Sequence, residues 1–150
     1  MMVNRDFVEL LQSFDDHDVQ FLIVGAHALA AHGHVRATRD LDVFLRPTAE
    51  NAERAIRALA AFGAPLDDLI ADDLATEGTI FQIGVAPVRI DILTRIDGVA
   101  FDEAYRDRVE TTFGGRPVAV LSREHLIRNK RASGRLQDLA DLERLESSGD

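Results

Sequence analysis

The sequence contains no cysteine and no tryptophan, and it has only one tyrosine. Without cysteine the chain can form neither disulfides nor thiolate metal sites, and catalysis by a thiol nucleophile is excluded. The scarcity of large aromatic side chains leaves little surface on which nucleic-acid bases could stack. Any RNA substrate would therefore have to be held mainly by basic residues.

Long apolar stretches and leader-like segments are missing as well. The chain has no apolar run of about 18 residues, the length from which a membrane-spanning helix is inferred. The first residues, MMVNRDFVELL, include two acids and no apolar h-region, so they do not have the pattern of a secretory signal. We therefore expect a cytoplasmic protein without a membrane partner.

Several motifs of nucleotide-binding and hydrolytic enzymes are also absent. The sequence has no G-x-x-x-x-G-K-[ST] phosphate loop, no G-x-G-x-x-G fingerprint and no serine in a nucleophile-elbow pattern. Any catalytic chemistry must therefore come from a different arrangement of side chains.

What the chain does have is an excess of negative charge, which is unevenly distributed. The net charge of −9 argues against broad DNA binding, which needs a cationic surface. Residues 65–77 hold five acids and no base, whereas residues 114–135 hold six bases and one acid. The basic segment suits a phosphate-bearing ligand, although solvent-exposed helix faces would produce the same pattern.

Hydrophobic periodicity predicts helices that alternate with strands. Helices are expected at 7–14 with Asn4 as N-cap, 26–32, 49–63, 101–109, 122–131 and 135–146, and strands at 19–24, 40–47, 79–84, 87–94, 110–113 and 118–121. The acidic residues 64–78 are expected to form a loop with a helical turn. This order predicts an α/β or α+β fold, a sheet covered by helices. We expect a single domain, 1–150, with a core to about residue 121 and C-terminal helices over about 122–146.

Two aspartates interrupt the otherwise apolar strand predicted at 40–47. Because side chains alternate along a strand, Asp40 and Asp42 point to the same face, and Leu41 points to the opposite, core-facing side. Two carboxylates about 5 Å apart repel each other by roughly 3 kcal/mol at an effective dielectric constant of about 20. A divalent cation between them would turn that repulsion into attraction. Ion pairs with nearby arginines such as Arg36 would be the alternative explanation.

A third aspartate, Asp91, lies in the middle of the predicted strand VRIDIL. If this strand is a neighbour of the strand at 40–47, three carboxylates gather on one face of the sheet. Such a set could bind two metal ions that activate a hydroxyl nucleophile and stabilise a leaving pyrophosphate. Arg89 is predicted on the same face as Asp91, where it could be the ion-pair partner of that carboxylate.

Four segments, in this order, resemble the DNA polymerase β-type nucleotidyltransferase superfamily: VGAHALAAHG, RATRDLDVFL, VRIDIL and KRASGRLQDLADLERL. The resemblance covers about residues 19–146 and is strongest to small prokaryotic members related to abortive-infection (AbiEii-like) and toxin–antitoxin nucleotidyltransferases. It implies a mixed sheet flanked by helices, with a C-terminal helix pair. It also implies Mg²⁺- or Mn²⁺-dependent transfer of NMP from an NTP to a hydroxyl of an RNA such as tRNA, a protein or a small molecule.

The same resemblance implies roles for individual residues. Asp40, Asp42 and Asp91 would be the catalytic metal ligands, and Asp91 would also act on the attacking hydroxyl. Gly25 and the residue after it would line the nucleotide phosphates. That next residue is Ala26, where a Gly or Ser is usual, so it can offer a phosphate only its backbone N–H.

Four further residues match the pattern of the family or lie close to the acidic pair. Lys130 matches a helix lysine that can reach the triphosphate. Arg36 could contact a phosphate or pair with an aspartate, and Thr38 could hydrogen-bond near the metal site or cap a turn. Arg135 begins an R-x-x-D motif that is expected to brace the two C-terminal helices.

Two other functions stay open at this point. Ala26, the short chain and the acidic composition are compatible with a weakly active or inactive interaction module that pairs with a toxin or antitoxin protein. A metal phosphohydrolase could use the same carboxylates but would normally need histidine ligands. The only support for it is the series His27, His32 and His34, in which the i, i+5 spacing does not stack two ligands on one helix face.

Overall fold

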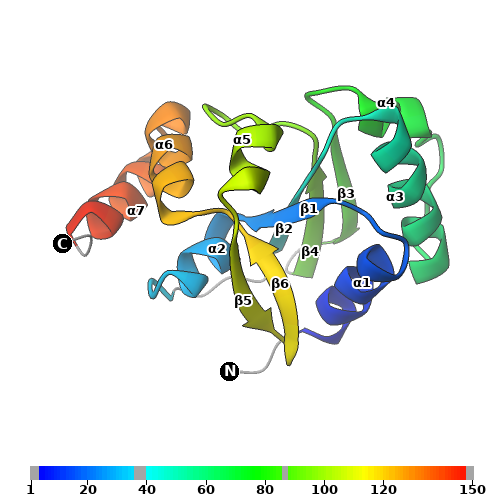
Figure 1. Ribbon diagram of the computed structural model, residues 1–150, viewed down its shortest axis with the longest axis horizontal. Helices are drawn as coiled ribbons and strands as arrows, with labels where there is room; N and C mark the ends of the chain where they lie inside the picture. Colours follow the sequence, from blue (N-terminus) through cyan, green and yellow to red (C-terminus); the bar gives the residue numbers. More distant parts are fainter. Residues whose placement is uncertain (1–3, 36–39, 86–87, 148–150) are drawn as a thin grey trace.

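Six strands form one sheet in the order β3-β4-β2-β1-β6-β5. The computed structural model describes residues 4–35, 40–85 and 88–147 (Figure 1). The strands are β1 (Phe21–Val24), β2 (Asp40–Leu45), β3 (Ile80–Val85), β4 (Val88–Leu93), β5 (Val109–Phe113) and β6 (Arg116–Val120). The helices are α1 (Arg5–Asp16), α2 (Gly25–Ala31), α3 (Ala49–Phe62), α4 (Ala71–Ala75), α5 (Phe101–Arg106), α6 (Arg123–Ser133) and α7 (Leu136–Ser147).

The sheet contains both parallel and antiparallel pairs. Strand β2 lies between β1, with which it pairs antiparallel, and β4, with which it pairs parallel. Strand β6 pairs parallel with β1 and forms an antiparallel hairpin with β5, while β3 closes the other edge antiparallel to β4. The predicted mixed sheet flanked by helices is therefore confirmed.

Local sequence signals place the ends of several helices. The side-chain oxygen of Asn4 accepts the backbone N–H of Asp6 at 2.8 Å, so the predicted N-cap of α1 is confirmed. Ser122 caps α6 in the same way by accepting the backbone N–H of His125 at 3.1 Å. Gly63 ends α3 in the left-handed conformation, with φ of 95°, which glycine adopts without steric cost.

Some predicted boundaries differ from those in the structure. The helix expected at 101–109 ends at Arg106, because residues from Val109 onward pair with β6 as strand β5. The short helix expected from residue 26 begins one residue earlier, at Gly25, directly after β1. The helical turn expected within 64–78 is α4.

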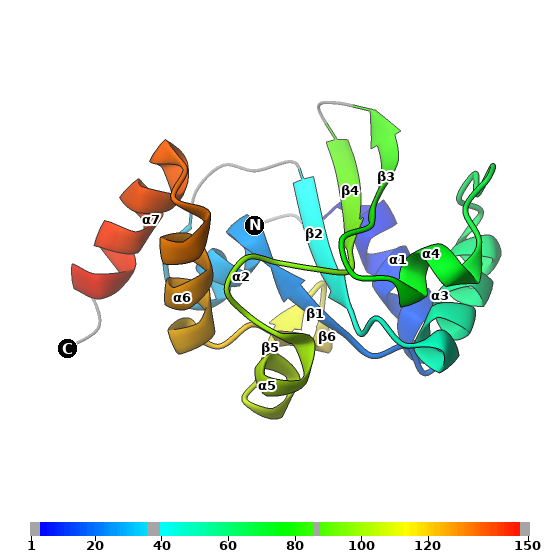
Figure 2. The ribbon, with the colours of Figure 1, turned by 90° about the horizontal axis from the view of Figure 1, so that it is seen from above.

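The apolar core lies on the face of the sheet opposite the two aspartates of β2 and around the fully buried strand β1. On β2, Leu41, Val43 and Leu45 are all buried, as the alternation of the strand predicts. Figures 1 and 2 both place α6 and α7 beside α2 at one end of the molecule, away from α1, α3 and α4. Within the described ranges, every helix is too short or too polar to cross a lipid bilayer.

Candidate active site

The three predicted aspartates meet on one face of the sheet at the β2–β4 pair. In this parallel pair Asp42 is aligned with Asp91, and Asp40 is aligned with Arg89. Aligned residues of neighbouring strands project to the same face, and residues two apart on one strand share that face. The condition set by the sequence, that the two strands are neighbours, is therefore met.

Asp42 is the most strongly perturbed member of this group. Burial, followed by the charges of Asp91 and Asp40, raises the pKa of the Asp42 carboxyl from its ordinary value of 3.8 to about 6. The positive charges of Lys130 and Arg89 act in the opposite direction without cancelling these effects. The local field therefore favours the arrival of additional positive charge beside Asp42.

Arg89 lies between two of the three carboxylates. Its Nε is 3.2 Å from Asp91 Oδ1, and one of its terminal nitrogens is 3.5 Å from Asp40 Oδ2. The predicted pairing of Arg89 with Asp91 is confirmed, and the second contact, with Asp40, follows from the strand register. In the described part of the chain, Arg89 Nε and Asp91 Oδ1 are buried without a hydrogen bond of good geometry.

Gly25 brings the start of α2 directly against Asp42. A Cβ atom built on Gly25 would lie 2.2 Å from Asp42 Oδ2, which is closer than any real contact allows. Gly25 also has a φ of 69°, in the left-handed region that favours glycine. The position therefore accepts only glycine without rearrangement, while the neighbouring Ala26 is buried against the core.

Carboxylate oxygens in a negative local field match the ligand chemistry that Mg²⁺ and Mn²⁺ prefer. Within residues 4–35, 40–85 and 88–147, however, the His, Asp and Glu side chains form no group of three that could hold a metal ion as they stand. The guanidinium of Arg89 already occupies the space between Asp40 and Asp91. The carboxylate oxygens are therefore suitable ligands for a divalent cation, but the guanidinium of Arg89 lies among them.

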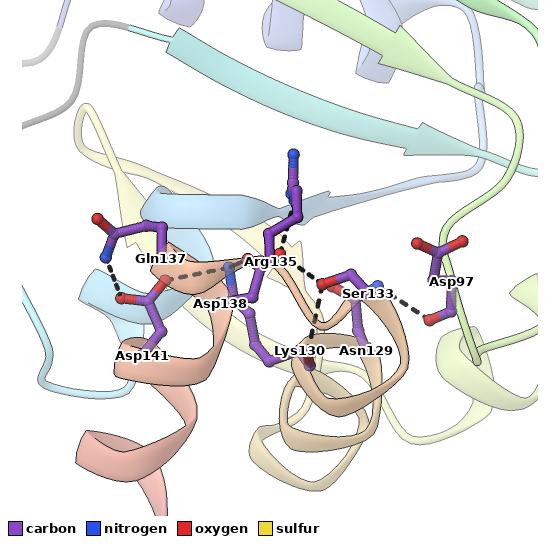
Figure 3. A network of polar contacts seen from close by, with 8 residues as sticks. All are labelled: Asp97, Asn129, Lys130, Ser133, Arg135, Gln137, Asp138 and Asp141. Atoms are coloured by element: carbon purple, nitrogen blue, oxygen red, sulfur yellow. Dashed lines mark hydrogen bonds and ion pairs between the residues drawn. The ribbon is translucent and has the colours of Figure 1, made fainter.

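The C-terminal helices contain a second charged cluster, which Figure 3 shows from close by. Lys130 of α6 places its Nζ 3.0 Å from Asp138 Oδ1 and 3.3 Å from Asp141 Oδ2, both on α7, and all three side chains are buried. Asp138 also accepts hydrogen bonds from Ser133 and from Arg135 Nε, the latter at 2.7 Å. The prediction that the R-x-x-D motif braces the two helices is confirmed for Asp138.

The electrostatics of this cluster connect it with the three carboxylates. Burial disfavours the charge of Asp138, but hydrogen bonds from Ser133, Arg135 and Lys130 outweigh it and lower the pKa of that carboxyl to about 2. The hydrogen bond to Asp138 raises the pKa of Arg135, and the charge of Asp42 raises it further. The side chain of Arg135 is 80% exposed and extends away from both helices (Figure 3).

The structure thus brings together Asp40, Asp42, Asp91 and Gly25, with Lys130 near enough to influence the charge of Asp42. Two predicted residues, Arg36 and Thr38, lie outside the described residues. The contact of Asp141 with Lys130 was not predicted from the sequence. A usable signal was present, because Asp138 and Asp141 are three residues apart and so share one face of a helix.

The histidines near α2 have surroundings of their own. His32 has its Nε2 2.8 Å from the backbone oxygen of Leu121, so its ring is tied to the residue that follows β6. The ring of His27 packs edge-on against Phe7 and Phe113, and burial lowers its pKa. These two rings are therefore parts of the packing between α2 and its neighbours.

Residues 3–149 match the family described as "Nucleotidyl transferase of unknown function", DUF2204, and the chain belongs to that family. No curated protein is significantly similar to it in sequence. The family assignment confirms the nucleotidyltransferase part of the resemblance found in the sequence. The narrower likeness to abortive-infection and toxin–antitoxin members stays a prediction.

Several solved structures share this fold, and two of them hold a bound small molecule. The lincosamide antibiotic adenylyltransferase LnuA, in its lincomycin-bound form, has a TM-score of 0.58 and 16% identity, with 97% of this chain and 98% of that chain covered. ANT(2")-Ia in complex with adenylyl-2"-tobramycin has a TM-score of 0.62 and 18% identity, with coverage of 95% and 86%. A candidate nucleotidyltransferase from Thermotoga maritima has a TM-score of 0.59 and 15% identity, with coverage of 97% and 94%. At these identities the likeness establishes the shared fold.

Proposed function

We propose that this protein transfers a nucleoside monophosphate from an NTP to a hydroxyl group of an acceptor, with Asp40, Asp42 and Asp91 as its acidic centre. The observation that carries the proposal is the alignment of Asp42 with Asp91 in the parallel β2–β4 pair, which puts all three carboxylates on one face of the sheet. Membership in a nucleotidyl transferase family supports the same reaction class.

In the proposed reaction the acceptor oxygen forms a bond to the α-phosphorus of the NTP. The bond from that phosphorus to the bridging oxygen of the β-phosphate breaks, and pyrophosphate leaves. Asp91 accepts the proton of the acceptor hydroxyl, for which a carboxylate close to the attacking oxygen is the chemical requirement. The neighbouring carboxylates of Asp40 and Asp42 make the local field negative, which favours the binding of positive charge beside Asp91.

Asp40, Asp42 and Asp91 would hold the divalent cation, Mg²⁺ or Mn²⁺, that such reactions use. When bound, the cation supplies charge stabilisation for the developing negative charge on the phosphate oxygens. The raised pKa of Asp42 supports this assignment, because the energetic cost of three neighbouring carboxylates is removed by a cation among them.

The nucleotide phosphates are proposed to lie over Gly25 and Ala26, next to Asp42. Gly25 allows the backbone to approach this closely, because any side chain would collide with Asp42 Oδ2. Lys130, whose Nζ is held in place by two buried carboxylates, contributes a positive charge that acts on Asp42. Arg36 and Thr38 complete the proposed nucleotide contacts on the basis of the sequence.

The acceptor favoured here is a small molecule that carries a hydroxyl group. One similar structure holds lincomycin and another holds adenylyl-2"-tobramycin, so this fold accommodates small molecules of this kind in those proteins. The net charge of −9 and the low aromatic content argue against a long RNA acceptor. A hydroxyl group on a protein is the alternative acceptor, and the test below distinguishes it from a small molecule.

The test incubates the full chain with each α-³²P-labelled NTP, Mg²⁺ or Mn²⁺, and separate panels of hydroxyl-bearing small molecules, RNA and proteins. Label should pass to an acceptor with release of pyrophosphate, and Asp91→Asn should abolish the transfer. Asp68→Asn, which neutralises an exposed aspartate outside the site, is the matched control and should keep full activity. Equal transfer by the wild type and Asp91→Asn would contradict the proposal. No transfer to any panel, together with tight binding of a partner protein, would favour the interaction module.

A further inference from the structure

The position of Arg89 carries an inference about how this site acquires its metal ion, and it rests on the function proposed above. We propose that Arg89 is a resident counter-cation that competes with the divalent metal ion for Asp40 and Asp91. Metal then enters the site only by displacing the guanidinium. The protein would accordingly bind free metal weakly and would bind it more strongly once the arginine has moved away.

The first support is the placement of the guanidinium, which the backbone dictates. Arg89 and Asp91 are two residues apart on β4, and Asp40 is aligned with Arg89 on β2. The side chain therefore projects onto the same face as the carboxylates and contacts two of them, at 3.2 Å and 3.5 Å. An arginine here offsets one of the negative charges that a cation would otherwise neutralise.

The second support is the quality of these contacts. Within the described residues, the Nε of Arg89 and Oδ1 of Asp91 are buried and lack a hydrogen bond of good geometry, although they are only 3.2 Å apart. The contact with Asp40 is longer still. The strongest arginine–carboxylate pairs are bidentate, with two short parallel hydrogen bonds, and neither pair of Arg89 has this form. The guanidinium is thus held by charge more than by directed bonds, which makes it displaceable by a cation of higher charge.

The third support is the space beside Arg89. Its aligned neighbour on the outer strand β3 is Gly84, which has no side chain and is exposed. The side chain of Arg89 is itself 34% exposed. Within the described residues, the aligned position on β3 therefore puts no side chain between the guanidinium and the solvent at the edge of the sheet.

The test measures binding of Mn²⁺ alone to the full chain, from the electron paramagnetic resonance signal of the free ion. Arg89→Gln should bind Mn²⁺ about tenfold more tightly than the wild type or better, because a unit positive charge has left two of the three ligands. Arg89→Lys, which keeps the charge, should stay near the wild-type affinity. Arg116→Gln is the matched control, since Arg116 is 33% exposed and pairs with Asp15 at 3.1 Å on other elements. It should leave Mn²⁺ binding unchanged.

The outcomes separate this inference from the proposed function. If Asp42→Asn abolishes Mn²⁺ binding but Arg89→Gln binds no more tightly than the wild type, Arg89 is only a structural ion pair and the inference is wrong, while the metal site stands. If neither the wild type nor Arg89→Gln binds Mn²⁺ in a manner that depends on Asp42, with or without a non-hydrolysable NTP, the proposed function and the inference both fail. If Arg89→Gln does not fold, Arg89→Ala or Arg89→Met, which also remove the charge, takes its place. The charge-free variant should bind Mn²⁺ about tenfold more tightly than Arg89→Lys, and equal affinities would overturn the proposal.

Discussion

Asp42 should destabilise the metal-free protein at neutral pH, so its replacement by asparagine should stabilise it. In the folded chain, burial and the charges of Asp91 and Asp40 raise the pKa of Asp42 from its ordinary value of 3.8 to about 6. Each pKa unit corresponds to about 1.4 kcal/mol, so ionised Asp42 costs the folded state about 3 kcal/mol. Asparagine has nearly the same shape and cannot ionise.

The dependence on pH follows from the direction of the pKa change. Well below pH 3.8, Asp42 is protonated in both the folded and the unfolded chain, and it adds nothing to the difference between wild type and Asp42→Asn. Between pH 4 and pH 6 the unfolded chain ionises first, so the wild type loses stability relative to the variant. Above pH 6 Asp42 is ionised in both states, and the full cost remains.

Urea unfolding in EDTA at pH 4 and at pH 7 measures this effect directly. The free energy of unfolding of Asp42→Asn should exceed that of the wild type by up to about 3 kcal/mol at pH 7, and by much less at pH 4. Asp68→Asn, at an exposed position, should differ from the wild type by less than about 0.5 kcal/mol at both pH values. A variant less stable than the wild type at pH 7, or a gain equal at both pH values, would refute this account of the site.

Three more predictions concern the surroundings of Asp42 and the C-terminal helices. Gly25→Ala should lower the free energy of unfolding by about 2 kcal/mol or more, because alanine disfavours the left-handed φ and its Cβ would collide with Asp42 Oδ2. Part of this loss should vanish when urea unfolding is repeated in an Asp42→Ala background, which removes the colliding oxygen. Lys130→Met should cost about 3 kcal/mol in the same assay, because it leaves buried carboxylates without their cation, whereas Arg131→Gln, which breaks an exposed pair, should cost less than about 1 kcal/mol. Asp138→Asn should make the unfolding free energy less dependent on pH between about 2 and 4, because the pKa of this carboxyl is lowered to about 2 in the folded chain and the wild type loses that stabilisation as the pH falls. Equal losses of stability for Gly25→Ala in both backgrounds would contradict the contact of Gly25 with Asp42. A Lys130→Met variant as stable as the wild type would contradict the ion pairs of Lys130. An Asp138→Asn variant with an unchanged pH dependence between about 2 and 4 would contradict the hydrogen bonds to Asp138.

Much of the fold was predictable because its signals are local. The continuous apolar run before Gly25 is typical of a buried strand, and every residue of β1 is buried. The alternation around Asp40 and Asp42 predicted which face of β2 meets the core. Asn4 marked the start of α1, because its side chain satisfies N–H groups of the first turn of that helix.

The site was predictable only up to the point where strands must be aligned with each other. Sequence alternation places Asp91 and Arg89 on one face of their strand, but the contact of Arg89 with Asp40 depends on the register of β4 against β2. The close approach of Gly25 to Asp42 depends on the turn from β1 into α2. The pairing of Lys130 with α7 likewise depends on how two helices pack, which no local pattern encodes.

The central claim is that Asp40, Asp42 and Asp91 form one cation-binding centre at which an NTP reacts. The most direct measurement is a crystal structure of the full chain soaked with Mn²⁺ and a non-hydrolysable NTP. We predict anomalous density for Mn²⁺ in contact with the carboxylates of Asp42 and Asp91, with the nucleotide phosphates bound at the same ion. A nucleotide bound elsewhere on the protein, or Mn²⁺ absent from these carboxylates in a fully soaked crystal, would contradict the claim.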